Sequence, residues 1–70
     1  DPEIIAFIES LVYKSARGDG STARILLGEY QYDAGDFVEE SLGVRFSGIN
    51  NSTRQILFTD SEGAVYYKPF

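Results

Sequence analysis

Carboxylates and tyrosines are the side chains of this sequence that could do chemistry, because the chain contains no histidine and no cysteine. Histidine is the commonest general base and metal ligand, and cysteine supplies disulfides and thiolate metal sites. A hydrolase built on two carboxylates would need them about 5 to 10 Å apart inside a cleft of several hundred Å³. A chain of 70 residues has little volume for such a cleft. We therefore expect no enzymatic activity, no metal and no cofactor.

The acidic residues are concentrated between Arg24 and Arg45, a stretch without lysine or arginine. The net charge is −5, and the other six acids are balanced by six bases, so the whole excess lies in this stretch. Carboxylates speed association with a basic partner, and tyrosines supply rigid contact area. We name residues 29–40 the acidic-aromatic segment. The expected partner-binding residues within it are Glu29, Tyr30, Tyr32, Asp33, Asp36, Glu39 and Glu40.

These features favour a small acidic protein-protein interaction module, of the inhibitor or adaptor type, that binds a basic protein surface. One alternative is a nucleic-acid-mimicking inhibitor whose carboxylates take the place of phosphates in a DNA- or RNA-handling protein. A second is a structural subunit that forms a homo-oligomer through exposed strands. A fourth interpretation, a solvated face whose aromatic residues belong to the core, is equally compatible with the pattern. Direct nucleic acid binding is not expected, since a positive lining is missing.

Several shorter motifs carry little weight. The acids do not follow the spacing of a calcium-binding loop. Arg17-Gly18-Asp19 spells an integrin-binding tripeptide, but a helix end explains Arg17 and Gly18 equally well. Asn50 and Asn51 begin two overlapping glycosylation acceptors, which matter only in a secreted protein. The stretch 18–22 resembles a phosphate-binding loop in composition but lacks the lysine, and we expect a helix before it where such a loop needs a strand.

The first residues predict an amphipathic helix of about four turns. Asp1 can cap it, Pro2 suits its first turn, and apolar residues recur at helical spacing up to Val12. Lys14 and Arg17 would complement the negative end of the helix dipole, and Gly18 would end the helix.

Strands are predicted after this helix. Residues 23–32 alternate, with a change of face at Gly28 that indicates a bulge or a bend. Residues 36–42 favour a short second helix ending at Gly43, with an extended conformation as the alternative. Val44 and Phe46 begin another strand, and residues 56–59 and 64–67 form a hairpin around a turn at 60–63. Pro69 should end the last strand.

The sum is an α+β fold in which the N-terminal helix packs on a mainly antiparallel sheet of three to four strands, with a possible short second helix at about 36–42. Residues 1–70 are expected to form a single domain. No apolar run is long enough to cross a membrane, so a soluble protein is expected. The lack of cysteine and of a signal-peptide pattern slightly favours the cytoplasm.

Overall fold

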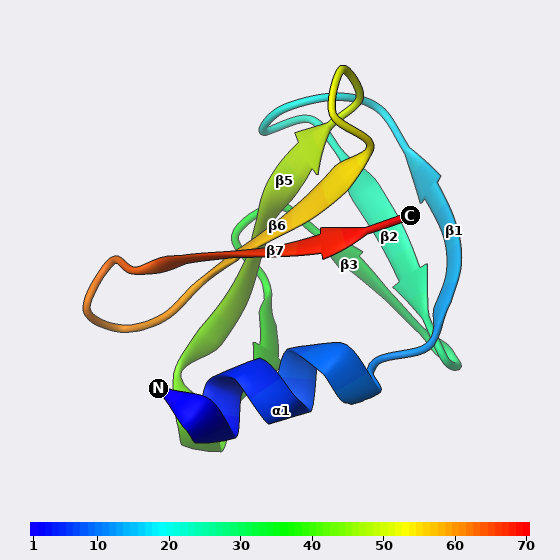
Figure 1. Cartoon of the computed structure of the whole chain (residues 1–70). Coiled ribbons are helices and arrows are strands. Elements are labelled where there is room, and N and C mark those ends of the chain that lie inside the picture. Colours follow the sequence, from blue (N-terminus) through cyan, green and yellow to red (C-terminus); the bar gives the residue numbers. More distant parts are fainter.

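One helix and two antiparallel sheets make up the chain in the computed structural model, which describes all of residues 1–70 (Figure 1). The α+β class is the one that the sequence predicts. The elements in chain order are α1 (Pro2–Ser10), β1 (Tyr13–Arg17), β2 (Arg24–Leu27), β3 (Tyr30–Asp33), β4 (Phe37–Glu39), the 3₁₀ turn η1 (Glu40–Leu42), β5 (Val44–Asn50), β6 (Gln55–Thr59) and β7 (Val65–Pro69). One sheet has the order β1-β2-β3 and the other β4-β5-β6-β7. The second sheet has the predicted strand number, whereas the first was not foreseen as a separate sheet.

Helix α1 begins as expected but is shorter than predicted. The Asp1 carboxylate accepts a 2.8 Å hydrogen bond from the Glu3 N–H, and Pro2 occupies the first turn. The helix ends at Ser10, and Leu11 is already extended, with φ −68° and ψ 136°. Lys14 and Arg17, expected in the last helical turn, lie instead in β1, which pairs antiparallel with β2. The predicted extension was wrong because pairing with β2 supplies the backbone hydrogen bonds of this stretch, which overrides its helical propensity.

The predicted strand 23–32 is in fact a hairpin. Gly28 and Glu29 form the two-residue turn between β2 and β3, and Gly28 has a φ of 59°. The turn pairs Leu27 with Tyr30 and Ile25 with Tyr32. Directly paired residues of an antiparallel ladder lie on the same face, so the chain reverses where a bend was expected. The change of face at Gly28 was therefore the signature of a turn.

The segment expected as a second helix is mainly extended. Strand β4 occupies 37–39, and only the single 3₁₀ turn 40–42 is helical. Residues 37–39 adopt an extended conformation because β4 pairs with β5, with Phe37 opposite Arg45. Gly43 does end the helical turn, in the left-handed conformation. The C-terminal hairpin of β6 and β7 is confirmed, and the last strand ends at Pro69.

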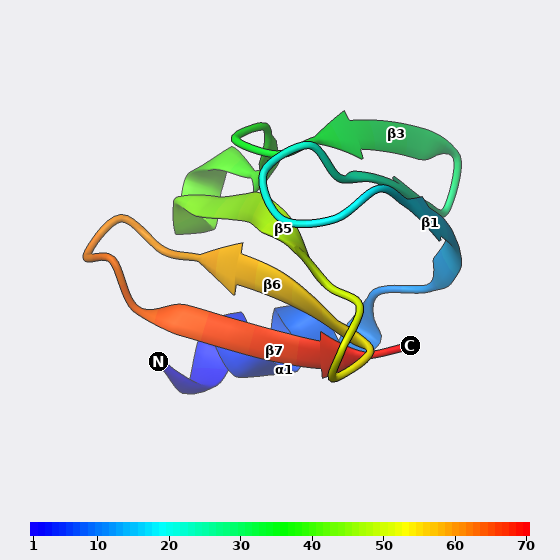
Figure 2. The ribbon, with the colours of Figure 1, turned by 90° about the horizontal axis from the view of Figure 1, so that it is seen from above.

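Both sheets and the helix enclose one apolar core. Its fully or nearly fully buried members are Ile4, Ile8, Ala23, Ile25, Leu27, Val44, Phe46, Ile49, Ile56 and Phe58. The rings of Phe46 and Phe58 meet edge to face, 6.3 Å between centroids. The loop after β1 passes over β5 in Figure 2, and a bridge between Gly20 in this loop and Ile49 of β5 joins the two parts of the chain there. The acidic-aromatic segment leads from one sheet to the other.

Candidate functional site

The acidic-aromatic segment follows the rim between the two sheets. It begins in the turn between β2 and β3, continues along β3, an edge strand, and ends in β4 and η1. Two backbone hydrogen bonds fasten the connection to β5, from the Gly35 N–H to the Phe46 carbonyl (2.7 Å) and from the Phe46 N–H to the Asp36 carbonyl (2.9 Å). The segment is therefore held by the sheet and presents a fixed surface.

The tip of the β2–β3 hairpin is the most exposed part of this surface. Tyr30 is 68% exposed, the largest exposure among the big apolar side chains of the chain. Glu29 beside it is exposed and has no ion-pair partner. A carboxylate next to an exposed tyrosine ring provides both charge and contact area for a partner.

Asp33 and Asp36 are engaged within the chain. The guanidinium Nε of Arg24 donates to Oδ1 of Asp33 at 2.6 Å, and both side chains are more than half exposed. The hydrogen bond and the charge of Asp33 raise the pKa of Arg24 above its ordinary value. The Asp36 carboxylate accepts a 2.8 Å hydrogen bond from the Asp33 N–H. These two acids thus also hold the connection in shape.

Arg45 enters the segment from β5. Its Nη1 donates a 2.8 Å hydrogen bond to the Gly35 carbonyl, and its guanidinium lies 4.0 Å from the centre of the Phe37 ring. The sequence places Arg24 and Arg45 outside the acidic stretch, but strand pairing brings both against it. The five carboxylates and these two arginines give the rim a net charge of −3, and Asp33 is the one carboxylate among them with an ion-pair partner.

The remaining predicted residues differ in role. Glu39 accepts hydrogen bonds from the Ser41 N–H (3.4 Å) and hydroxyl (3.0 Å), whereas Glu40 is exposed and unpaired. Tyr32 is half-buried and packs against the core. The predicted residues thus follow one course of the chain along the rim, from the β2–β3 turn to η1, and Glu29, Tyr30 and Glu40 are its most available members.

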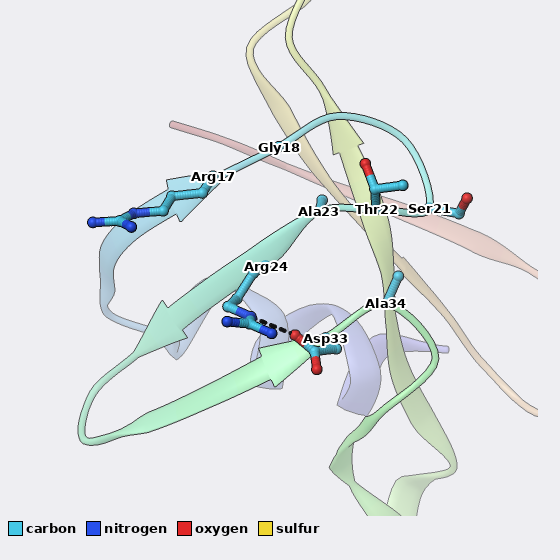
Figure 3. Close-up of a pocket in the computed structure, with 8 residues that line it drawn as sticks. All are labelled: Arg17, Gly18, Ser21, Thr22, Ala23, Arg24, Asp33 and Ala34. Carbon is cyan, nitrogen blue, oxygen red and sulfur yellow. Dashed lines mark hydrogen bonds and ion pairs between the residues drawn. The ribbon is translucent and has the colours of Figure 1, made fainter.

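A shallow hollow of about 480 Å³ adjoins this rim at Arg24 and Asp33 (Figure 3). The side chain of Arg17 extends away from Ser21 and Thr22 in the same view, and that of Arg24 turns to Asp33. The polar groups do not converge on one point, as those of a catalytic or anion-binding site would. No three acidic side chains gather as metal ligands do. The hollow therefore lacks the convergent polar groups of an active site.

Fold and rim together define an α+β domain of two antiparallel sheets with an ordered acidic edge. Comparisons with protein-family models, curated proteins and solved structures give no match to this chain. Its one helix is too short to span a membrane. Any function must consequently be argued from the surface itself.

Proposed function

We propose that the chain is a protein-protein interaction module that binds a basic surface of another protein through the acidic-aromatic segment. The supporting observation is the tip of the β2–β3 hairpin, where the 68% exposed Tyr30 stands beside the unpaired carboxylate of Glu29. The net charge of −3 at the rim, to which the exposed Glu40 contributes, adds an attractive field for a basic partner. Binding through this strip would require no catalytic group.

Mimicry of a nucleic acid has less support. A mimic must present many regularly spaced negative charges, because the duplex carries about one per 1.7 Å of axis. Arg24 and Arg45 interrupt the strip, and Asp33 is neutralised by its partner. We therefore favour a protein partner with a local cluster of lysines or arginines.

The test combines capture with charge removal. A photo-crosslinking amino acid at position 30 should capture a partner from extract of the source cells, whereas the same group at Val12, which is 62% exposed, should not. With the identified partner, Glu29→Gln plus Tyr30→Ala plus Glu40→Gln should weaken binding about tenfold or more. A charge-matched control is Glu3→Gln plus Glu62→Gln, with both residues exposed outside the segment. Equal effects of the two sets, or an affinity independent of salt, would overturn the proposal.

A further inference from the structure

The outer edge of β7 offers unpaired backbone groups. β7 is the last strand of its sheet and pairs only with β6. Hydrogen bonds from the Asp60 N–H to the Ala64 carbonyl (3.1 Å) and from the Phe70 N–H to the Arg54 carbonyl (3.0 Å) fix the alternation of this ladder. Hydrogen-bonded and non-hydrogen-bonded pairs alternate, so Tyr66 and Lys68 turn their backbone groups to β6. Val65 and Tyr67 therefore direct their N–H and C=O groups to the free edge.

An apolar groove accompanies this edge. Helix α1 runs alongside β7, below it in Figure 1 and behind it in Figure 2. The groove between them measures about 290 Å³ and is lined by Ile5, Ile8 and Glu9 of the helix and by Val65, Tyr66 and Tyr67 of the strand. Ile5 and Val65 are each 46% exposed, and Tyr67 is 57% exposed. Exposed apolar area next to an open strand edge is typical of an association site.

We propose that this edge and groove form the interface of a two-fold symmetric dimer, in which β7 pairs antiparallel with β7 of a second copy. With the axis at Tyr66, Val65 of each copy stands opposite Tyr67 of the other. This register satisfies the two outward N–H and two outward C=O groups of each copy in four hydrogen bonds. The two four-stranded sheets become one sheet of eight strands. The inference is independent of the acidic-aromatic segment.

Three features favour a second copy over a loose extended peptide. Pro69 has no N–H, so Val65 and Tyr67 are the two positions on the free edge that can form complete backbone pairs. In an antiparallel dimer each of these two residues pairs with the other in the second copy. A second copy also brings its own α1, so the exposed Ile5 gains an apolar neighbour. Glu9 is the one charged residue that lines the groove, and the neighbouring Lys68 ammonium donates a 3.4 Å hydrogen bond to the Glu9 backbone carbonyl. An acid and a base thus lie together here, whereas the acidic excess of the chain lies in residues 29–40.

The available area predicts a weak dimer. A specific interface needs about 1,000 Å² in total, or about 500 Å² from each copy, roughly a ninth of the 4423 Å² surface of the chain. Tyr67, Val65 and Ile5 can supply much of it together with the strand backbone. We therefore expect a dissociation constant of about 10 µM to 1 mM.

Sedimentation from about 10 µM to 2 mM tests the proposal. The intact chain should shift from monomer to dimer. Ile5→Glu should raise the dissociation constant tenfold or more, because two like charges would face each other across the axis. Val12→Glu, which adds the same charge at a residue 62% exposed outside the groove, should leave it unchanged. A monomer at every concentration, or equal effects of the two variants, would overturn the proposal.

Amide hydrogen exchange of the intact chain locates the interface without any substitution. The N–H groups of Val65 and Tyr67 should become protected as the concentration rises. Those of Tyr66 and Lys68 should be protected at all concentrations, since they already bond to β6. Val65→Pro removes one outward donor and no bond to β6, so it should weaken the dimer while the far-ultraviolet spectrum is retained. Dimerisation without protection of Val65 and Tyr67 would place the interface elsewhere and contradict the proposal.

Discussion

The phenolic hydroxyl of Tyr66 donates a 2.9 Å hydrogen bond to the carboxylate of Asp60 across the turn between β6 and β7. The other carboxylate oxygen accepts hydrogen bonds of 2.9 Å from the N–H groups of Glu62 and Ala64. The hydrogen bond to Asp60, together with burial and nearby negative charge, raises the pKa of Tyr66 above 10.0. This pair ties the turn to the strand that borders the proposed dimer groove.

Tyr66→Phe should destabilise the chain at neutral pH and change its response to alkali. The folded state holds the Tyr66 proton more tightly than the unfolded state, so this contribution is fully present below about pH 10. It is lost as the pH rises through the folded-state pKa. Urea unfolding of both proteins between pH 7 and 11.5 should show the difference in their free energies of unfolding narrowing above pH 10. A constant difference would contradict the assignment of the raised pKa to Tyr66.

Asp60→Asn should change how the stability of the chain depends on pH in the acidic range. Burial acts to raise the pKa of Asp60, but the hydrogen bonds from Tyr66, Ala64 and Glu62 outweigh it and lower the pKa below 3.8. Because the folded-state pKa is lowered, the ionised Asp60 stabilises the fold at any pH above its unfolded-state pKa of about 3.9. This contribution is lost as the pH falls through the folded-state pKa. The intact chain should thus exceed the variant in stability at pH 6 and lose this advantage towards pH 2. Urea midpoints across that interval measure it, with Glu62→Gln as the control.

The same conservative substitution, isoleucine to valine, can be compared at one position in the core and at one on the surface. Ile56 is 0% exposed and Ile5 is 46% exposed. Ile56→Val should lower the free energy of unfolding by about 0.5–1.5 kcal/mol, because the surrounding core cannot fully close over the lost methylene. That is a large part of a total of roughly 3.5–10 kcal/mol for a chain of this size. Ile5→Val, measured by the same urea titration at a concentration where the chain is monomeric, should have little effect.

Gly48 allows the two sheets to approach each other closely. Its φ is 149°, and a Cβ there would lie 2.5 Å from the backbone carbonyl oxygen of Gly20. Gly48→Ala should therefore cost about 2 kcal/mol or more, from the strained φ and the displaced loop. Gly28 has a φ of 59° and open space around it, a conformation that asparagine tolerates, so Gly28→Asn should cost well under 1 kcal/mol. Similar losses in the two variants would show that close approach is not the cause.

Local signals in the sequence were sufficient to predict those elements whose interacting residues lie close together along the chain. The cap at Asp1 and the hairpin around the turn 60–63 were predicted for this reason. The helix was predicted too long because its apolar spacing continues by coincidence through Leu11 and Val12, which lie between α1 and β1. Gly28-Glu29 lacks the usual Asn-Gly signature of a two-residue turn, so the hairpin was interpreted as a bend.

The acidic strip could be located from the sequence, but its charge could not be determined. Arg24 and Arg45 reach it only through strand pairing, and no local pattern shows which strands will pair. Glu29, Tyr30 and Glu40 remain predicted contact residues that the geometry leaves available. The edge of β7 escaped prediction because the sequence does not show which strand will lie last in a sheet.

The tip of the β2–β3 hairpin should be unnecessary for folding. Tyr30 is 68% exposed, and Glu29 has no ion pair in the chain, so neither contributes a buried contact. Glu29→Gln plus Tyr30→Ala should therefore change the free energy of unfolding by no more than about 0.5 kcal/mol. Tyr32→Ala should cost clearly more, since Tyr32 packs against the core. If urea unfolding shows this contrast, a loss of partner binding in the first variant reports on the contact surface, whereas a destabilised first variant would mean that the tip has a structural role.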